Sequence, residues 1–268
     1  MSESEDCLSL SAGSYGSGPF ANQSPLRSSM ASGLLHTRTA MCLPEFCIRA
    51  SPIAGTYSSS ESTCRGGTLI DVGANVGSVS LLLADAIEDA ILFEPNPVAA
   101  ARARENLARN QLGFKVYEVA LSDTNSEIRF ECHGAVDVGG HVVTSAPSSL
   151  TAARVVQCIT FDEFLRQHGD PGFPVSLVKI DVEGHENSVL RGMRQFLAEK
   201  RPPLVMFEYL QRTNLGETLS FFDGVGYQVF ELGTNGPVAV TGRVKPLQDL
   251  FACPLERMPA IGVASATS

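Results

Sequence analysis

From Thr68 onward, short runs of apolar residues alternate with stretches whose apolar positions recur every three or four residues. The short runs are typical of strands buried on both faces of a sheet, and the recurring positions predict amphipathic helices. Strands that alternate with helices form βαβ units with right-handed crossovers. The pattern therefore predicts an α/β fold with a Rossmann-like, doubly wound and mainly parallel sheet. The expected strands are 68–73, 89–94, 114–121, 126–132, 154–159, 175–181, 204–210 and 227–232.

The expected helices have recognisable start and stop residues. Asn96 and Pro97 suit a helix N-cap and first position, and Gly113 suits the residue after the helix. Thr160 and Glu163 form a capping-box pair that opens another helix. The expected helices are 76–87, 96–113, 160–165, 187–200 and 216–226.

Residues 1–66 lack this periodicity and contain fifteen serines. Such a stretch buries too little apolar surface to offset its ordering entropy, so we expect it to be mostly disordered. A targeting peptide is the alternative, because 19–60 contain three arginines and one acid, Glu45. We expect one folded domain at 67–258, followed by a frayed tail at 259–268. Residues 133–153 are rich in Gly and Ser and are expected to form a long loop.

Composition narrows the classes of partner and compartment. The formal net charge of −9 argues against holding nucleic acid or anionic membrane through bulk charge. Apolar runs stay well short of 18 residues, so no membrane span is expected. The seven cysteines include no CxxC pair and no zinc-finger spacing, which favours a reducing compartment, and we expect a cytoplasmic location. The oligomeric state is left open.

Acidic residues recur at the ends of the expected strands. Asp71 ends the first strand, Glu94 the second, Asp181 the strand 175–181, and Glu208 comes late in 204–210. Ligands of open α/β sheets bind beyond the carboxyl ends of the strands. Together with Glu183, these acids predict a polar site that accepts hydroxyl, ammonium or sulfonium groups.

The turn after the first strand reads DVGANVG, with Gly73 and Gly77 on either side of three residues. Glycine lets the backbone turn tightly and approach a ligand without a Cβ clash, and the next helix points its N-terminus at that ligand. The spacing G-x-N-x-G differs from the G-x-G-x-x-G of dinucleotide sites. Glu94 follows at the distance at which an acid reaches ribose hydroxyls. A purely structural turn with a surface glutamate is the alternative.

Seven blocks, over about residues 68–232, resemble the FkbM-type S-adenosylmethionine-dependent methyltransferases. They are LIDVGANVG, FEPNP, ENLARNQ, VALSD, LVKIDVEGHE, VLRGM and GYQVFEL. The resemblance implies a class I methyltransferase fold with a seven-stranded sheet, and S-adenosyl-L-methionine as cofactor. It also implies that the amino-acid portion of the methyl donor is lined by Gly73, Ala74, Asn75 and Gly77.

The same resemblance implies further roles at the donor site. Asp71 would support the glycine loop, and Glu94 would hold both ribose hydroxyls. Val119 and Ala120 would border the adenine. Many class I enzymes have an acid at that point, and the nearest one here is Asp123, three residues on.

Asp181 and Glu183 are the candidate catalytic residues. A hydroxyl acceptor must lose its proton as it attacks the methyl group, and a carboxylate at the strand end can take that proton or orient the acceptor. Two neighbouring acids also raise each other's pKa. Glu183 could instead simply form the turn into the next helix. Lys179, two residues before Asp181, is expected to be a buried ion-pair partner, with a catalytic role as the alternative.

Other polar residues of the chain could have either a functional or a purely structural role. His185 could act as a base or could take a solvated or capping position. His141, in the Gly- and Ser-rich loop, could touch an acceptor or could simply belong to a mobile loop. Glu208 could line the acceptor side or bond backbone. Asp181, Glu183 and Glu208 offer hard oxygen ligands, but nothing in the sequence demands a metal and none is predicted.

The leading hypothesis is O-methylation of a hydroxyl on a small molecule or glycan. A nicotinamide-dependent Rossmann oxidoreductase is the second, although G-x-G-x-x-G and a Tyr-x-x-x-Lys pair after the third strand are both missing. A non-catalytic S-adenosylmethionine-binding module is the third. Acids near the methyl group disfavour phosphorylated or carboxylate acceptors there.

Overall fold

The computed structural model describes residues 66–131, 141–142, 153–233, 236–242 and 244–262. The expectations for the Ser-rich segment up to residue 65 and for most of the 133–153 loop fall outside these ranges. No helix in the described residues is long and apolar enough to cross a membrane.

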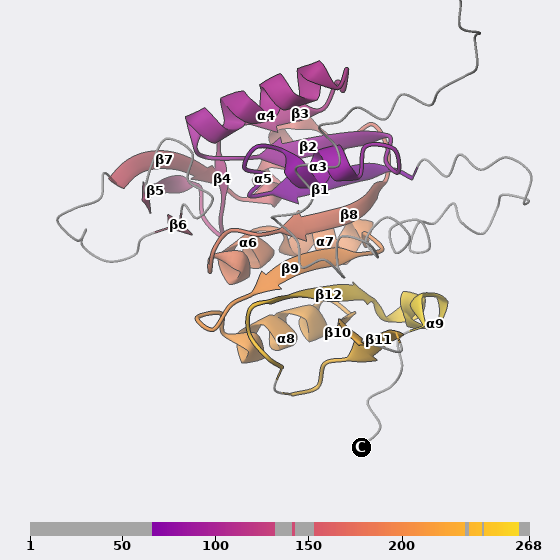
Figure 1. Cartoon of the computed structure of the whole chain (residues 1–268). Helices are drawn as coiled ribbons and strands as arrows, with labels where there is room; N and C mark the ends of the chain where they lie inside the picture. Colours follow the sequence, from indigo (N-terminus) through magenta and orange to yellow (C-terminus); the bar gives the residue numbers. More distant parts are fainter. Residues whose placement is uncertain (1–65, 132–140, 143–152, 234–235, 243, 263–268) are drawn as a thin grey trace, which may run out of the picture.

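The main sheet has eight strands in the order β11-β10-β12-β9-β8-β1-β2-β3 (Figure 1). The parallel strands are β1 (Thr68–Val72), β2 (Asp89–Phe93), β3 (Lys115–Tyr117), β8 (Val175–Ile180) and β9 (Val205–Tyr209). The remaining strands, joined by antiparallel pairs, are β10 (Tyr227–Gly233), β11 (Gly236–Ala239) and β12 (Gln248–Pro254).

Strand order reverses beside β1, because the chain runs outward from β1 to β2 and β3 and then returns to β8 on the other side. Val72 at the end of β1 pairs with Phe93 of β2 and with Ile180 of β8. The point between β1 and β8 is therefore the topological switch point, where open α/β sheets bind ligands beyond the carboxyl ends of the strands.

The α/β class and the mainly parallel sheet are confirmed, but the prediction of seven strands is wrong, because the main sheet has eight. The eighth strand is β11, which forms a hairpin with β10 at the sheet edge. Strand β12 was also missed, because QDLFACP begins with two polar residues and has no clear alternation. Its last five residues are buried between β10 and β9, where tertiary packing decides the structure.

The predicted strand 114–121 is divided between two sheets. Its first part, β3, completes the main sheet, and β4 (Ala120–Leu121) joins a second sheet of order β4-β7-β5-β6. The other strands of that sheet are β5 (Ser126–Glu131), β6 (His141–Val142) and β7 (Ala153–Ile159). Strand β6 falls inside the segment 133–153 that was expected to be a loop.

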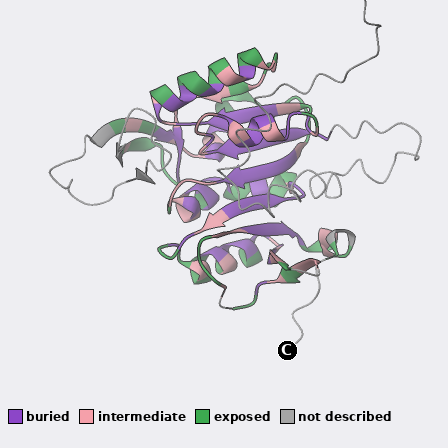
Figure 2. Cartoon of the chain, in the orientation of Figure 1, coloured by how far each residue is buried: buried purple, intermediate pink, exposed green. Residues whose placement is uncertain are grey.

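Helices cover both faces of the main sheet. One face packs against α3 (Ser78–Leu82) and α4 (Pro97–Arg109). The other packs against α5 (Phe161–His168), α6 (Glu186–Gly192), α7 (Arg194–Lys200) and α8 (Leu215–Gly224). The strands β1, β2 and β8 between them are almost wholly buried (Figure 2). Near the end of the chain, η1 (Leu255–Arg257) leads into α9 (Met258–Ile261), so the tail expected from residue 259 starts inside a short helix.

Three helix predictions need correction. The helix expected at 76–87 is only the five-residue α3, with Gly77 as its N-cap. Asn96 caps α4 by accepting a bond from the Val98 N–H at 3.0 Å, but the residue with positive φ after the helix is Gln111, not Gly113. The helix 187–200 is broken between α6 and α7, where Gly192 packs against the backbone of Ser122.

Candidate active site

A buried lysine joins β1 to β8 at the switch point. The Nζ of Lys179 lies 3.2 Å from a carboxylate oxygen of Asp71 and 3.5 Å from one of Asp181, and it donates to the Gly73 carbonyl at 2.7 Å. Burial disfavours the ammonium, but the Asp71 and Asp181 carboxylates outweigh this effect and raise the pKa of Lys179 above its usual value. Lys179 therefore stays charged and fixes the glycine loop to the strand end.

Asp71, in β1 just before the glycine loop, supports this loop through its polar partners. Its side chain is fully buried and accepts a hydrogen bond from the Ser80 hydroxyl at 2.8 Å, besides its ion pair with Lys179. A buried carboxylate is tolerable only with such partners. The pairing explains why an acid occupies an otherwise apolar strand.

The two glycines of the loop are required for different physical reasons. Gly73 has φ 75°, and a Cβ there would lie 1.9 Å from the Asp181 carbonyl oxygen, so its place is set by the close approach of β8. The fold alone therefore requires glycine at this position, whether or not a ligand also approaches it. Gly77 has φ 81° and ordinary neighbours, so its backbone conformation is what requires glycine. Asn75, between them, also takes positive φ, 51°.

Glu94, at the end of β2, joins this loop to the start of α4. Its carboxylate accepts hydrogen bonds from the backbone N–H groups of Asn75 and Asn96, both at 2.8 Å. Burial raises the pKa of Glu94 in spite of these two donors. A carboxylate has about four lone-pair positions, so each oxygen can still accept a hydroxyl hydrogen.

Three carboxylates meet over the ends of β8 and β9. One carboxylate oxygen from each of Asp181, Glu183 and Glu208 lies within 4.8 Å of the other two. Glu208 Oε2 is buried with no hydrogen-bond partner among the described residues. Burial, followed by the nearby carboxylates of Asp181 and Glu183, raises the pKa of Glu208 to about 8. Glu208 can therefore hold and release a proton near neutral pH. The three residues together are called the acid cluster, and their oxygens are of the type that bind hard cations.

Arg212, in the loop between β9 and α8, holds one member of the acid cluster. It donates to the Glu183 carboxylate at 3.0 Å and also bonds the Glu183 carbonyl. Its side chain lies across Gly184, where a Cβ would meet the Arg212 Nε at 2.3 Å. Glu183 itself has φ 55°, a conformation that is uncommon outside glycine. Sequence reasoning missed Arg212, since only the folded chain brings the two turns together.

The second sheet ends beside the start of α6. The ring Nε2 of His185 lies 2.9 Å from the hydroxyl of Ser122, which follows β4 and Ala120. Burial lowers the pKa of His185, which favours the neutral ring at pH 7. Partial burial acts to raise the pKa of Asp123, but hydrogen bonds from Arg191 outweigh this effect and lower the pKa. The Asp123 carboxylate is thus held in an ion pair with Arg191.

Most of the predicted site residues therefore lie around one point. Those at the carboxyl ends of β1, β2 and β8, or in the turns that follow, are Asp71, Gly73, Ala74, Asn75, Gly77, Glu94, Asp181 and Glu183. Ala120 lies in the second sheet, linked to this region through the contact of Ser122 with His185. The side chain of His141 is outside the described residues.

An open α/β sheet with a glycine turn after its first strand, an acid after its second and carboxylates at the switch point belongs to the Rossmann-like class of folds, which bind nucleotide-type cofactors at this place. The model of the FkbM methyltransferase domain matches residues 71–229, which is more than half of the chain. The protein belongs to the FkbM methyltransferase family. This confirms the resemblance found in the sequence and favours a methyltransferase over the nicotinamide-dependent alternative.

Two curated relatives are also methyltransferases. The hexuronic acid methyltransferase AglP of Haloferax volcanii is 34% identical over 129 residues, 48% of this chain and 51% of that protein. The 2-O-methyltransferase NoeI of Sinorhizobium fredii is 28% identical over 148 residues, 50% of this chain and 60% of that protein. The chain spans about half the length of the curated relatives it matches.

Solved structures of methyltransferases are also similar. A methyltransferase FkbM from Methylobacillus flagellatus matches with 16% identity and a TM-score of 0.45, covering 85% of this chain and 58% of that one. A precorrin-6y C5,15-methyltransferase from Geobacter metallireducens matches with 13% identity and a TM-score of 0.46, covering 83% and 92%.

S-adenosylmethionine is the cofactor of this class of methyltransferase, and the switch point fits it. Glu94 keeps free acceptor positions for two hydroxyls, as a ribose requires. Next to the glycine loop, the Ser78 hydroxyl is buried without a hydrogen-bond partner among the described residues. The acid cluster favours a positively charged sulfonium nearby.

Proposed function

We propose that the protein is an S-adenosylmethionine-dependent O-methyltransferase whose acceptor is a hydroxyl of a small molecule or glycan. The observation on which this rests is the acid cluster beside the glycine loop, at the switch point of the sheet. The two relatives, a hexuronic acid methyltransferase and a 2-O-methyltransferase, support a sugar-like acceptor.

The donor would be held by the loop and strand ends of the switch point. Glu94 would accept hydrogen bonds from the ribose hydroxyls, and Ala120 would border the adenine. Asp71, through Ser80 and Lys179, would keep the loop in place. The amino-acid portion would be lined by Gly73, Ala74, Asn75 and Gly77.

The acid cluster would handle the proton of the acceptor. When bound, S-adenosylmethionine supplies an electrophilic methyl group on a positively charged sulfur. Asp181, or Glu183 beside it, would accept the hydroxyl proton and orient the oxygen. Burial, followed by the nearby carboxylates of Asp181 and Glu183, raises the pKa of Glu208 to about 8, so Glu208 keeps a proton at neutral pH beside the proposed base.

Asp181→Asn tests this role. The amide keeps the shape of the carboxylate but is no longer a base, so we expect transfer to fall by roughly 10²–10⁴-fold. The measurement is transfer of a labelled methyl group to a panel of sugars and phenols, with affinity for S-adenosylhomocysteine measured in parallel.

Asp223→Asn, an exposed acid of α8, is the matched control and should keep wild-type transfer. Affinity for S-adenosylhomocysteine should stay within a few fold in both variants. Wild-type transfer by Asp181→Asn would remove Asp181 from the mechanism, and absence of labelled product on any hydroxyl with the wild-type protein would contradict O-methylation.

A further inference from the structure

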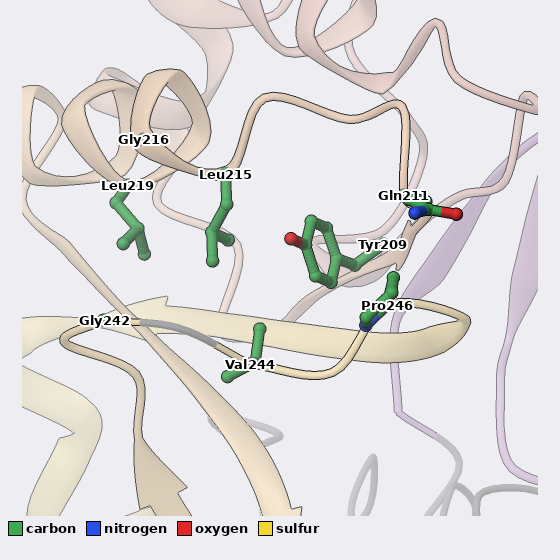
Figure 3. A pocket seen from close by; sticks show the side chains of 8 residues that line it. All are labelled: Tyr209, Gln211, Leu215, Gly216, Leu219, Gly242, Val244 and Pro246. Atoms are coloured by element: carbon green, nitrogen blue, oxygen red, sulfur yellow. The ribbon is translucent and has the colours of Figure 1, made fainter.

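A cavity of about 580 Å³ opens beside the carboxyl end of β9. Figure 3 shows Leu215 and Leu219 of α8 pointing across it toward Val244, with the ring of Tyr209 between Leu215 and Pro246. Its volume lies within the range of small-molecule sites, roughly 300–1,000 Å³. None of the proposed donor-site or catalytic residues lines it.

The cavity adjoins the acid cluster through one loop. Tyr209 directly follows Glu208 of the cluster, and Gln211 directly precedes Arg212, which bonds Glu183. Consecutive Cα atoms are about 3.8 Å apart, so the cavity wall and the proposed reaction centre are neighbours on the rim of the sheet.

The cavity and the acid cluster nevertheless lie on opposite sides of β9. Successive side chains of a strand point to opposite faces, and Tyr209 packs with the apolar cluster on the α8 side, as Phe207 does. Glu208 therefore points to the other face, with Asp181. A molecule that reaches both places must pass over the end of β9, so it must be longer than the group that is methylated.

The lining has the chemistry of a site for an uncharged sugar ring. Tyr209 offers an aromatic face against which the C–H face of a pyranose can pack, and the Gln211 amide both donates and accepts hydrogen bonds. Among the described residues, the other side chains that line it are aliphatic and no lining residue is charged. An anionic group would find no cation among the lining residues that the structure describes, and it would have three carboxylates nearby.

We propose that this cavity binds a neutral sugar unit of the acceptor other than the one that receives the methyl group. The acceptor is then a glycan or glycoside of at least two units, one over the acid cluster and one against Tyr209. This inference rests on the proposed function, because it gives that reaction its acceptor class.

Sugar binding can be measured without turnover. The full chain, saturated with S-adenosylhomocysteine, is tested by saturation-transfer NMR against the neutral disaccharides cellobiose, maltose, lactose and diacetylchitobiose, with glucose and octanol as comparisons. We expect a neutral disaccharide to bind more tightly than glucose. Absence of binding by all four disaccharides, or tighter binding of octanol, would overturn the proposal.

Variants of the lining assign that binding to the cavity. Tyr209→Ala removes the aromatic face and Leu219→Trp fills the space, so each should weaken disaccharide binding about tenfold or more. Tyr209→Phe keeps the ring and should stay within about twofold of the wild type. Leu112→Trp, at a partly buried position packed on the opposite face of the sheet, is the control for the added indole and should have no effect.

Two measurements separate the possible failures. Affinity for S-adenosylhomocysteine should be unchanged in all four variants, which shows that each one folds and keeps its donor site. Disaccharide binding that is unaffected by both Tyr209→Ala and Leu219→Trp would overturn the cavity proposal and leave methyl transfer untouched. Failure of the wild-type protein to bind S-adenosylhomocysteine would refute the proposed function. Disaccharide binding that the cavity variants weaken would still show that the cavity binds sugar.

Discussion

At the scale of single residues, the site depends on how buried charges are paired. Asp71 and Lys179 are both buried, and the protein can bury each charge because the opposite charge lies 3.2 Å away. The sequence showed an acid in a buried strand and a lysine next to Asp181, which is enough to suspect an ion pair. It could not show that the partner is Asp71, from a strand about a hundred residues earlier, because that pairing depends on the sheet order.

Lys179→Met tests this pairing. It leaves the Asp71 carboxylate buried and without its cation, so we expect a loss of about 3–5 kcal/mol in the free energy of unfolding. The measurement is urea unfolding followed by circular dichroism. Lys115→Met, at an exposed position in β3, is the control and should change the free energy by no more than about 0.5 kcal/mol. Equal losses in the two variants would contradict the structural role given to Lys179.

At the scale of elements, the sequence predicted strands and caps more accurately than element ends. The caps at Asn96 and Thr160 are found where they were expected, since a cap bond is local. The break between α6 and α7 is not local. Gly192 would place a Cβ 1.9 Å from the Ser122 carbonyl oxygen, so this part of the helical stretch is fixed by a contact with the end of β4.

Gly192→Ala sets helix propensity against this contact. Alanine favours a helix by about 1 kcal/mol over glycine, but a backbone overlap at 1.9 Å cannot be relieved by a side-chain rotation. We therefore expect a net loss of stability of roughly 1–3 kcal/mol. Gly224→Ala in α8, where the Cβ would meet an arginine nitrogen at 3.8 Å, should be neutral or stabilising. Thermal unfolding of both variants measures the difference, and a stabilised Gly192→Ala would refute this account of the break.

At the scale of the whole molecule, the chain gathers acids from distant strands at one edge. Each acid at a strand end was visible in the sequence, and the α/β pattern predicted that these ends share an edge. The sequence also allowed Glu208 to join Asp181 and Glu183 as a set of oxygen ligands, and their closeness in the fold depends on β9 lying beside β8. The cavity beyond β9 was invisible, because part of its wall comes from the segment before the unexpected strand β12.

The acid cluster should make stability depend on pH. The pKa of Glu208 is raised from an ordinary 4.5 to about 8, mainly by burial. Between these values the folded protein keeps a proton that the unfolded chain has lost, so this group makes folding less favourable as pH rises through the window. Above about pH 8 the penalty stays constant, and below about pH 4.5 it disappears.

Glu208→Gln removes this penalty. Its Tm should match the wild type near pH 4.5 and exceed it increasingly up to pH 8, by roughly 2–4 °C for each kcal/mol of penalty. Differential scanning fluorimetry across this range, without ligand, makes the comparison. The exposed Glu105→Gln should follow the wild type throughout. A Tm difference that does not depend on pH would contradict the raised pKa.

The central claim is that the switch point between β1 and β8 binds the methyl donor, and its most direct test is calorimetry with S-adenosylhomocysteine. Glu94→Gln replaces one carboxylate oxygen by a donor, so one ribose hydroxyl loses its acceptor and the Asn75 or Asn96 N–H loses its partner. We predict that the wild type binds and that the variant binds at least about tenfold more weakly. Glu105→Gln on α4 should bind as the wild type does. Unchanged affinity in Glu94→Gln would contradict the account.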